Sequence, residues 1–221
     1  MNFYSFYHIR RRLKRENGTD GGRRNICLLF WRKHLEISVK YDTIVRNNGK
    51  EVRRMIILGI DPGYAIVGYG LVEFQNNRFK VLDYGAITTD KDEDMSVRLK
   101  HIYSELQHLI DLYHPDAVAI EELFFNKNAK TAILVAQGRG TAIVACANKN
   151  VPLHEYTPLQ IKQALVGYGR ADKKQIQYMV RMILNLKEVP KPDDTADALA
   201  VAICHGNSYH ASNIMDLKTG I

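Results

Sequence analysis

Apolar and polar positions change their period along the chain, and these changes predict a series of strands and helices. The run Met55–Asp61 is almost continuously apolar, as expected of a short strand buried on both faces. Two more strands are predicted at Ala65–Phe74 and Arg78–Thr88, separated by the polar turn Gln75-Asn76-Asn77. The apolar positions of Leu99–Tyr113 then recur at helical spacing, so this region predicts three strands followed by a helix.

Strands and helices alternate in the remainder of the chain. The predicted strands are Asp116–Glu121 and Leu153–Tyr156, and the predicted helices are Asn128–Asn148, Thr157–Gly167 with Thr157 as N-cap, Lys173–Leu186 and Thr195–His205. Three consecutive strands followed by such alternation favour an α/β fold with a mixed five-stranded sheet and helices on both faces. The order is that of the ribonuclease-H-like fold, which nucleases, transposases and actin-like ATPases share, so the fold leaves the function open.

Residues 1–54 differ from the rest in charge and pattern. They carry 14 Lys and Arg against 5 Asp and Glu, a net charge of +9, whereas residues 55–221 carry 17 against 19. They show little sustained periodicity, so we expect a basic extension outside the fold, either disordered or an artefact of the start site with Met55 as the true start, followed by a folded domain at residues 55–221. A transit peptide and a basic DNA-binding arm are the alternatives, and the acidic Glu16 and Asp20 count against the first.

The spacing of the cysteines and the hydropathy of the chain indicate the cellular compartment in which the protein works. Cys27, Cys146 and Cys204 are widely spaced and form no CxxC pair, which favours buried inert thiols in a reducing cytoplasm over disulfides or a zinc site. No apolar stretch of the sequence approaches the roughly 18–20 residues that span a bilayer. We therefore expect a cytoplasmic protein without a membrane partner.

Two of the predicted buried strands end in a carboxylate. Asp61 closes the first strand in Ile60-Asp61-Pro62-Gly63, and Glu121 closes a later one in Val118-Ala119-Ile120-Glu121. Open α/β sheets bind ligands at the carboxyl ends of their strands, and the two acids would lie side by side if these strands are neighbours. Glu122 would point to the opposite face, because side chains alternate along a strand. Taken alone, Asp61 is equally compatible with the start of an Asx turn.

A third group of acids, Asp193, Asp194 and Asp197, lies at the start of the last predicted helix. Asp194 and Asp197 are one helical turn apart and share a face, whereas Asp193 is better placed as an N-cap. Simple capping explains this group equally well when it is taken alone. Four carboxylates in one site, however, would repel one another and raise their pKa values unless cations compensate. Mg²⁺ or Mn²⁺ is the usual cation, and two such ions can activate a water and stabilise the leaving 3′-oxygen of a phosphodiester.

Five sequence blocks resemble successive signatures of the RuvC family of Holliday junction resolvases, in the order and spacing of that family. The blocks are Ile57–Gly63, Ala119–Glu121, Gln137–Gly140, Tyr168–Lys173 and Asp194–Ala200. The resemblance covers about residues 55–205 and leaves the basic segment before Met55 unmatched.

The resemblance implies a structure-selective endonuclease that resolves four-way DNA junctions by hydrolysing phosphodiesters in opposed strands during recombination and DNA repair. It implies two Mg²⁺ ions per subunit, which Mn²⁺ can replace, held by four catalytic carboxylates: Asp61, Glu121, Asp194 and Asp197. Lys162 and Lys173 match basic positions that the family uses near the scissile phosphate, where they would offset charge in the transition state.

Contacts to the junction are expected from one aromatic and several basic residues. The resemblance places Phe124 on an unpaired base near the crossover, and we expect its neighbour Phe125 to be the core residue. Lys127, Arg170 and Lys174 are the expected phosphate contacts. The alternatives are that both rings belong to the core and that the lysines form an ordinary solvated helix face.

The predicted helix at residues 128–148 carries many small residues, among them Ala136, Gly138 and Gly140, which allow another helix to approach closely. The family's dimers pair through this region, so we expect a homodimer whose two-fold symmetry matches a junction with two strands to cut. The family's members work with the RuvA–RuvB branch-migration complex, which is the expected partner.

Three other functions are open on the residues alone. A YqgF-like nuclease acting on structured RNA would share the Gly-Ile-Asp strand end, but is not expected to carry the Asp194–Ala200 block together with Lys162 and Lys173. An actin-like ATPase needs a second phosphate-binding domain, for which the chain is too short. The four acids count against a junction-binding scaffold without chemistry. The sequence predicts neither the preferred cleavage sequence nor a requirement for the helicase partners.

Overall fold

The computed structural model describes residues 44–47, 50–123 and 129–219. Its elements are β1 (Ile44–Asn47), β2 (Lys50–Arg53), β3 (Met55–Asp61), β4 (Ile66–Gln75), β5 (Arg78–Thr88), α3 (Met95–Tyr113), β6 (Ala117–Glu121), α4 (Ala129–Ala147), β7 (Leu153–Tyr156), α5 (Pro158–Val166), α6 (Lys173–Ile183) and α7 (Asp193–Thr219). From β3 onward, the order of strands and helices is the predicted one, and the α/β fold is confirmed.

Several helix boundaries differ from the predicted ones. Helix α3 begins at Met95, before the apolar period starts at Leu99, because most of its first turn is exposed to solvent. Helix α6 ends at Ile183, earlier than predicted, and Asn185 then turns the chain with a φ of 50°. Helix α7 begins before Thr195 and continues well past His205.

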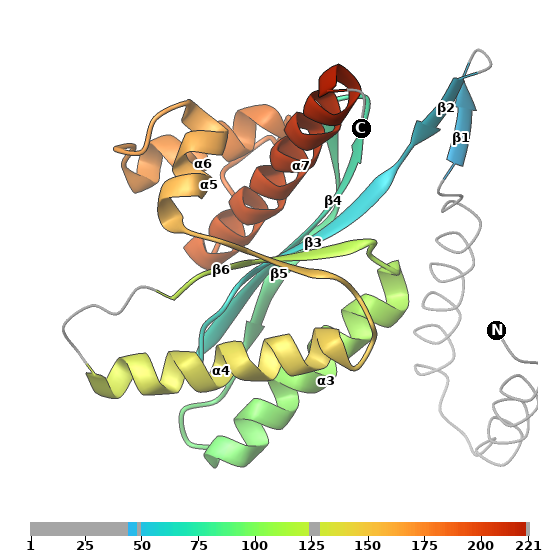
Figure 1. The fold of residues 1–221 in the computed structure, drawn as a ribbon. Coiled ribbons are helices and arrows are strands. Elements are labelled where there is room, and N and C mark those ends of the chain that lie inside the picture. The colour runs from blue at the N-terminus through green and yellow to red at the C-terminus, as the bar shows by residue number, and fades with distance from the viewer. Residues whose placement is uncertain (1–43, 48–49, 124–128, 220–221) are drawn as a thin grey trace, which may run out of the picture. The chain divides into compact units, whose positions relative to one another are not determined.

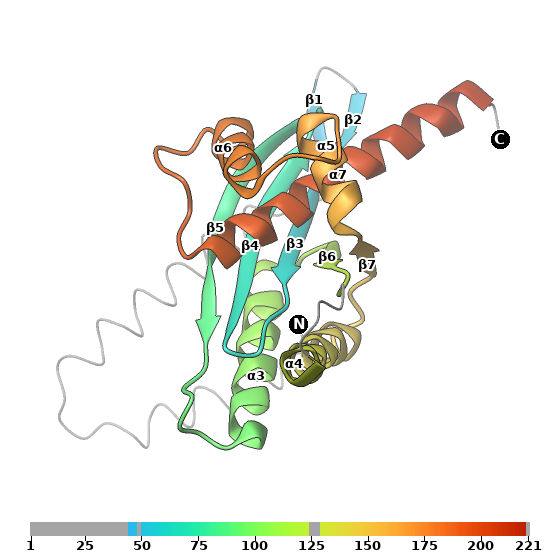
Figure 2. The same ribbon diagram turned by 90° about the vertical axis from the view of Figure 1, so that its left-hand side faces the viewer.

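The five strands β3–β7 form one mixed sheet in the order β5-β4-β3-β6-β7. Strand β3 is central, antiparallel to β4 and parallel to β6. Helices α5, α6 and α7 cover one face of the sheet, and α3 and α4 cover the other (Figure 1). Figure 2 shows α7 running across the face of the sheet. The predicted mixed five-stranded sheet with helices on both faces is therefore confirmed.

Glycines in the strands allow α7 to lie directly on the sheet. A Cβ atom at Gly59 of β3 would overlap the carbonyl oxygen of Ala198, and one at Gly68 of β4 would overlap the carbonyl oxygen of Asp194. Apolar side chains of α7, such as the fully buried Leu199, fill the space beside this contact. A glycine inside a strand often marks such a close approach of backbones. The first turns of α7 are thereby held against the strand ends.

Residues 44–54 fall within the segment that we expect to lie outside the fold, yet the structure gives them regular structure. Strands β1 and β2 pair antiparallel, in a register that sets Val45 opposite Val52. Arg54 is buried, and its guanidinium lies 3.7 Å from the carboxylate of Glu73 on β4. The strands at residues 44–53 therefore differ from the disorder that we expect for this segment. Residues 1–43 lie outside the described residues, and the domain boundary stays a prediction.

Cys146 and Cys204 are buried free thiols, as the sequence predicts, whereas Cys27 lies outside the described residues. Burial raises the pKa of Cys146 to about 12 and that of Cys204 to about 11, so both thiols stay protonated at neutral pH. Among the residues that the structure describes, no helix combines the length and apolarity needed to cross a membrane.

Candidate active site

Asp61 and Glu121 end two adjacent parallel strands. Strand β3 pairs with β6 in a register that sets Ile60 opposite Ile120, so the two following carboxylates are neighbours at the same sheet edge. Side chains alternate along a strand, so Asp61 shares a face with Gly59, which contacts α7. Both carboxylates are half-buried. The prediction that the two strand-end acids lie side by side is confirmed.

The first turns of α7 bring Asp194 and Asp197 to the same edge. The backbone of Asp194 lies against Gly68, and the charges of both residues act on Asp61. Asp193 is not the N-cap that the sequence suggests, because α7 already begins at this residue. Its exposed carboxylate instead lies 3.2 Å from the Nζ of Lys173.

Burial and mutual repulsion disfavour the ionised forms of the strand-end acids. Burial, together with the charges of Glu121, Asp197 and Asp194, raises the pKa of Asp61 to about 8. Burial and the charge of Asp197 raise the pKa of Glu121 to about 7. Burial also raises the pKa of Asp197, against the opposing effect of Lys173. The site therefore has an excess of negative charge that a bound cation would relieve.

Lys173 supplies part of the missing positive charge. Its Nζ lies 3.1 Å from the Asp197 carboxylate, in addition to its contact with Asp193. Burial alone would lower the pKa of Lys173, but the hydrogen bonds and ion pairs with these two carboxylates outweigh it and raise the pKa. Lys162 on α5 is half-buried, and its charge lowers the pKa of Glu121. The structure thus brings both predicted lysines to the carboxylates.

The start of α6 fixes the position of Lys173. The Asp172 carboxylate accepts a hydrogen bond of 2.9 Å from the backbone N–H of Gln175, and the Gln175 side chain accepts one of 2.9 Å from the N–H of Asp172. This capping box satisfies two backbone donors at the helix end. Because Lys173 is the first residue of α6, the capping box also fixes where its side chain leaves the backbone.

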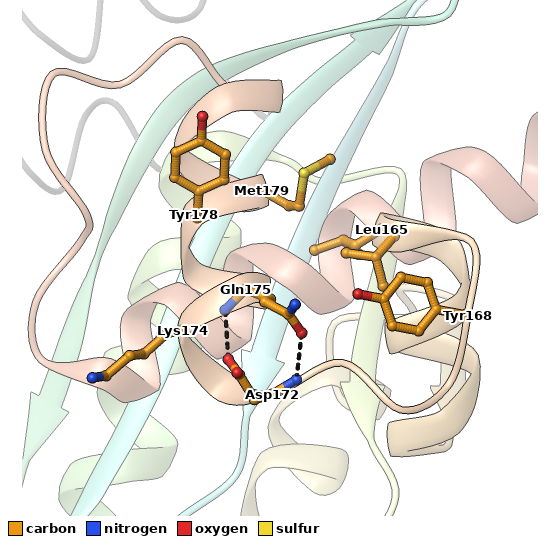
Figure 3. A pocket seen from close by; sticks show the side chains of 8 residues that line it. Leu165, Tyr168, Asp172, Lys174, Gln175, Tyr178 and Met179 are labelled. Atoms are coloured by element: carbon orange, nitrogen blue, oxygen red, sulfur yellow. Dashed lines mark hydrogen bonds between the residues drawn. The ribbon is translucent and has the colours of Figure 1, made fainter.

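The two other described DNA-contact candidates do not contact the carboxylates. Lys174 lines a separate cavity of about 500 Å³ between α5 and α6, together with Tyr168 and Tyr178 (Figure 3). Arg170 is exposed in the turn before α6. Phe124, its neighbour Phe125 and Lys127 lie outside the described residues.

The chemistry of the four carboxylates suits a hard divalent cation. Such ions prefer anionic oxygen ligands, and the raised pKa values of Asp61 and Glu121 mark the charge that they would neutralise. In the described part of the chain, no three Asp, Glu, His or Cys side chains already stand at the spacing of a closed metal site. Cation binding would therefore draw the carboxylates together and compete with Lys173 for Asp197.

The raised pKa values predict how stability depends on pH. The pKa of Asp61 is about 8 in the folded protein and 3.8 ordinarily, and that of Glu121 is about 7 and 4.5. Between these pH limits the folded state therefore binds more protons than the unfolded state. This contribution to stability is complete below about pH 4 and is lost as the pH rises through 7 to 8. We expect the melting temperature in EDTA to fall by several degrees between about pH 5 and pH 9.

Added Mg²⁺ should reverse that fall, because it binds the ionised carboxylates of the folded state. Asp61→Asn should flatten the pH dependence in EDTA, because it removes the group with the larger shift. Differential scanning fluorimetry across this pH range measures both effects. An identical slope for the wild type and Asp61→Asn would contradict the electrostatic description of the site.

Comparison with known proteins places this site in a family. The family model for the crossover junction endodeoxyribonuclease RuvC matches residues 57–205, which include all four carboxylates and both lysines. The chain belongs to the RuvC family. Members of the family are metal-dependent nucleases, in keeping with the carboxylate chemistry.

Individual relatives agree with the family model. The chain is 61% identical to the RuvC of Alkaliphilus oremlandii over 164 residues, 74% of this chain and all of that protein. It is 60% identical to the RuvC of Clostridioides difficile over 154 residues, 70% of this chain and 91% of that protein. These matches favour neither the YqgF-like nor the actin-like alternative.

Solved structures give the same result. Thermus thermophilus RuvC matches with a TM-score of 0.68 and 35% identity, over 72% of this chain and 97% of that one. The RuvC of the same organism in complex with a Holliday junction substrate matches with a TM-score of 0.69 and 36% identity, over 72% and 96%. The ribonuclease-H-like architecture predicted from the order of elements is therefore confirmed.

Sequence reasoning missed three residues that shape the site. Gly59 and Gly68 make room for the backbone of α7, and their positions inside apolar strands are a signal that could have revealed this contact. Arg139 on α4 donates a hydrogen bond to the backbone carbonyl of Glu121 at 3.3 Å. It lies in the Gln137–Gly140 block, but nothing in the sequence connects it to Glu121.

Proposed function

We propose that this protein resolves four-way DNA junctions by metal-dependent hydrolysis of phosphodiesters in two opposed strands, during recombination and DNA repair. The gathering of Asp61, Glu121, Asp194 and Asp197 at one sheet edge carries the proposal, because such a site suits phosphodiester hydrolysis. The likeness to Thermus thermophilus RuvC, which has been solved with a Holliday junction substrate, supports the choice of substrate.

The four carboxylates would hold two Mg²⁺ ions in each subunit, and Mn²⁺ could replace them. Bound there, the ions would activate water and stabilise the leaving 3′-oxygen. The charge of Lys162 lowers the pKa of Glu121, and the Nζ of Lys173 lies 3.1 Å from the Asp197 carboxylate. Lys173 now contacts the Asp197 carboxylate, and it would be available to offset charge on the scissile phosphate if Asp197 instead held a cation.

Four residues are proposed to hold the junction. Phe124 would stack on an unpaired base near the crossover, which contributes about 1–3 kcal/mol for each stacked base. Lys127, Arg170 and Lys174 would contact phosphates. The exposure of Arg170 and Lys174 leaves both side chains accessible to DNA.

We propose that the protein is a homodimer paired through α4. Two apolar side chains of this helix, Ile133 and Val144, are 60% and 52% exposed. Gly140 lies between them in the sequence, and a Cβ atom there would meet no atom within 4 Å. Exposed apolar side chains beside a small residue suit close packing against a second helix. A two-fold dimer also presents two active sites to two opposed strands.

Val144→Glu is expected to convert the dimer to a monomer, because a carboxylate buried in an apolar interface would have no partner. Val97→Glu is the matched control, since Val97 is 45% exposed on α3 and should leave the dimer intact. Mass photometry or light scattering of both variants tests the proposal. A dimer that persists in Val144→Glu would exclude this face of α4 as the interface.

The remaining features follow the family. We propose a cytoplasmic protein that works with the RuvA–RuvB branch-migration complex. We also propose that residues 55–221 form the nuclease domain and that residues 1–54 are a basic extension of it, with net charge +9.

The deciding experiment offers three labelled substrates to the full chain: a four-way junction, a linear duplex of the same sequence and a structured RNA. We expect paired cuts in opposed strands of the junction with Mg²⁺ or Mn²⁺, and binding without cleavage with Ca²⁺. Cleavage of the RNA in preference to the junction would instead support the YqgF-like alternative. Equal cleavage of junction and duplex would contradict structure selectivity.

A further inference from the structure

Helix α4 contacts the turn that follows Asp61. A Cβ atom at Gly138 would overlap the carbonyl oxygen of Gly63 and lie 3.4 Å from the Cα of Tyr64. Only a residue without a side chain fits this contact, so the backbone of α4 lies directly on the turn. The helix that carries the proposed dimer face is thus also in contact with the Asp61 strand end.

The next residue of α4, Arg139, contacts the other strand end. Its Nε–H donates to the backbone carbonyl of Glu121 at 3.3 Å, and its Nη2 donates to the carboxylate of Glu155 on β7. The Arg139 side chain is largely buried, at 16% relative exposure. Glu155 directly precedes Tyr156, which pairs with Glu121 in the sheet. One guanidinium therefore links α4 to the ends of β6 and β7.

The contact acts on the position of Glu121 through its backbone. The positive groups that lower the pKa of Glu121 are Lys162 and Lys173, while the charge of Arg139 is paired with Glu155. A guanidinium offers several donors in one rigid plane, so the ion pair with Glu155 fixes the direction of the Nε–H toward the carbonyl. Glu121 is the last residue of β6, and the N–H of Glu122 after it still donates to the carbonyl of Tyr156 at 2.9 Å. The Arg139 contact therefore adds a restraint on the Glu121 carbonyl from α4 to the one that β7 already supplies.

We infer that Arg139 is a positioning residue, which holds the backbone of Glu121 at the place where its carboxylate can act with Asp61. The inference rests on the proposed function. Its physical basis is the sensitivity of catalysis to geometry, since a displacement of about 1 Å can slow a reaction by about 10²-fold. Arg139 needs no contact with the substrate for this role.

The test compares Arg139→Ala, Arg139→Lys and Glu155→Gln with the wild type in the full-length chain. Junction cleavage is measured at increasing DNA concentration, and Mn²⁺ binding is measured by calorimetry without DNA. We expect Arg139→Ala to lower kcat by about 10–100-fold with KM changed less than about threefold, and to weaken Mn²⁺ binding. Arg139→Lys keeps the charge but not the planar fork, so it should stay impaired. Glu155→Gln replaces the ion pair by a neutral acceptor, so it should lower kcat in the same direction as Arg139→Ala but by less.

Three results would overturn the inference. A raised KM with normal kcat would make Arg139 a DNA contact, and full activity of Arg139→Lys would make it a simple source of charge. The third result is a loss of kcat in Arg139→Ala that equals the loss of dimer or of folded protein, while each folded subunit still binds Mn²⁺ normally. Arg139 would then have only a structural role. If Arg139→Ala does not fold, Arg139→Lys and Glu155→Gln still give the kcat, KM and Mn²⁺ comparison. Failure of the wild type to cut the junction would overturn the proposed function instead, and Mn²⁺ binding would still test Arg139.

Discussion

Asp61→Asn is expected to abolish junction cleavage, by about 10³-fold or more, while junction binding stays close to wild type. Asp61 is the most perturbed of the candidate ligands, with its pKa raised to about 8 by burial and by three neighbouring carboxylates. Asparagine keeps the size of the side chain but removes the anionic oxygen that a cation needs. It also lessens repulsion of the DNA phosphates, so binding should not suffer. Cleavage and gel-shift assays in Mg²⁺ and in Ca²⁺ separate the two effects.

Asp116→Asn is the matched control for this prediction. Asp116 precedes β6 at the opposite end of the same pair of strands, where its carboxylate accepts a hydrogen bond of 2.7 Å from the backbone N–H of Ile56. Asparagine retains an acceptor there, so cleavage should be preserved. Near-normal cleavage by Asp61→Asn in Mg²⁺ would show that the site is wrongly assigned. Equal loss in both variants would indicate a general effect on the sheet.

Gly68→Ala is expected to reduce cleavage by about 10²-fold, because a 1 Å displacement of a catalytic group has an effect of this size. The added methyl group would overlap the carbonyl oxygen of Asp194, which belongs to the backbone of α7 and cannot rotate away. The start of α7 must therefore move off β4 and take Asp194 and Asp197 with it. Melting temperature, junction cleavage and Mn²⁺ affinity are measured together, and Mn²⁺ affinity should fall.

Gly85→Ala on β5 is the control for the glycine substitution. A Cβ atom at Gly85 would lie 2.8 Å from the hydroxyl oxygen of Tyr69, the far end of a side chain that can move. Both variants add one methyl group to the same sheet, but only one displaces α7. If Gly68→Ala cuts and binds Mn²⁺ as well as Gly85→Ala does, close packing of α7 is not what positions the acids.

The sequence predicts most of the site because its acids lie at positions defined by local patterns. A buried apolar strand ends at Asp61 and another at Glu121, and helical spacing pairs Asp194 with Asp197. Taken alone, Asp61 is equally compatible with a turn, and the group Asp193, Asp194 and Asp197 with a helix cap. Their combination in one site depends on β3 and β6 being neighbours, which the sheet order confirms. The resemblance to the RuvC family adds Lys162 and Lys173 to the predicted site, because no local pattern connects these lysines to the acids.

Other parts of the site depend on contacts between distant segments, which no local pattern specifies. The ion pair of Lys173 with Asp193 and Asp197 joins the starts of α6 and α7, and Arg139 reaches Glu121 from another helix. The sequence favours Asp193 as a cap before the helical turn that joins Asp194 to Asp197, whereas α7 begins at Asp193 itself. The sequence does not indicate the hairpin before Met55, because positive charge dominates this segment and its alternation of apolar and polar residues is short.

A crystal structure of the protein with bound Mn²⁺ tests the central claim most directly, because anomalous scattering locates the ions independently of any assay. We expect anomalous peaks among Asp61, Glu121, Asp194 and Asp197, with the Nζ of Lys173 withdrawn from the Asp197 carboxylate on which it now lies at 3.1 Å. Mn²⁺ bound elsewhere, or carboxylates that stay apart with Lys173 in place at saturating Mn²⁺, would contradict a metal-dependent nuclease site at this sheet edge.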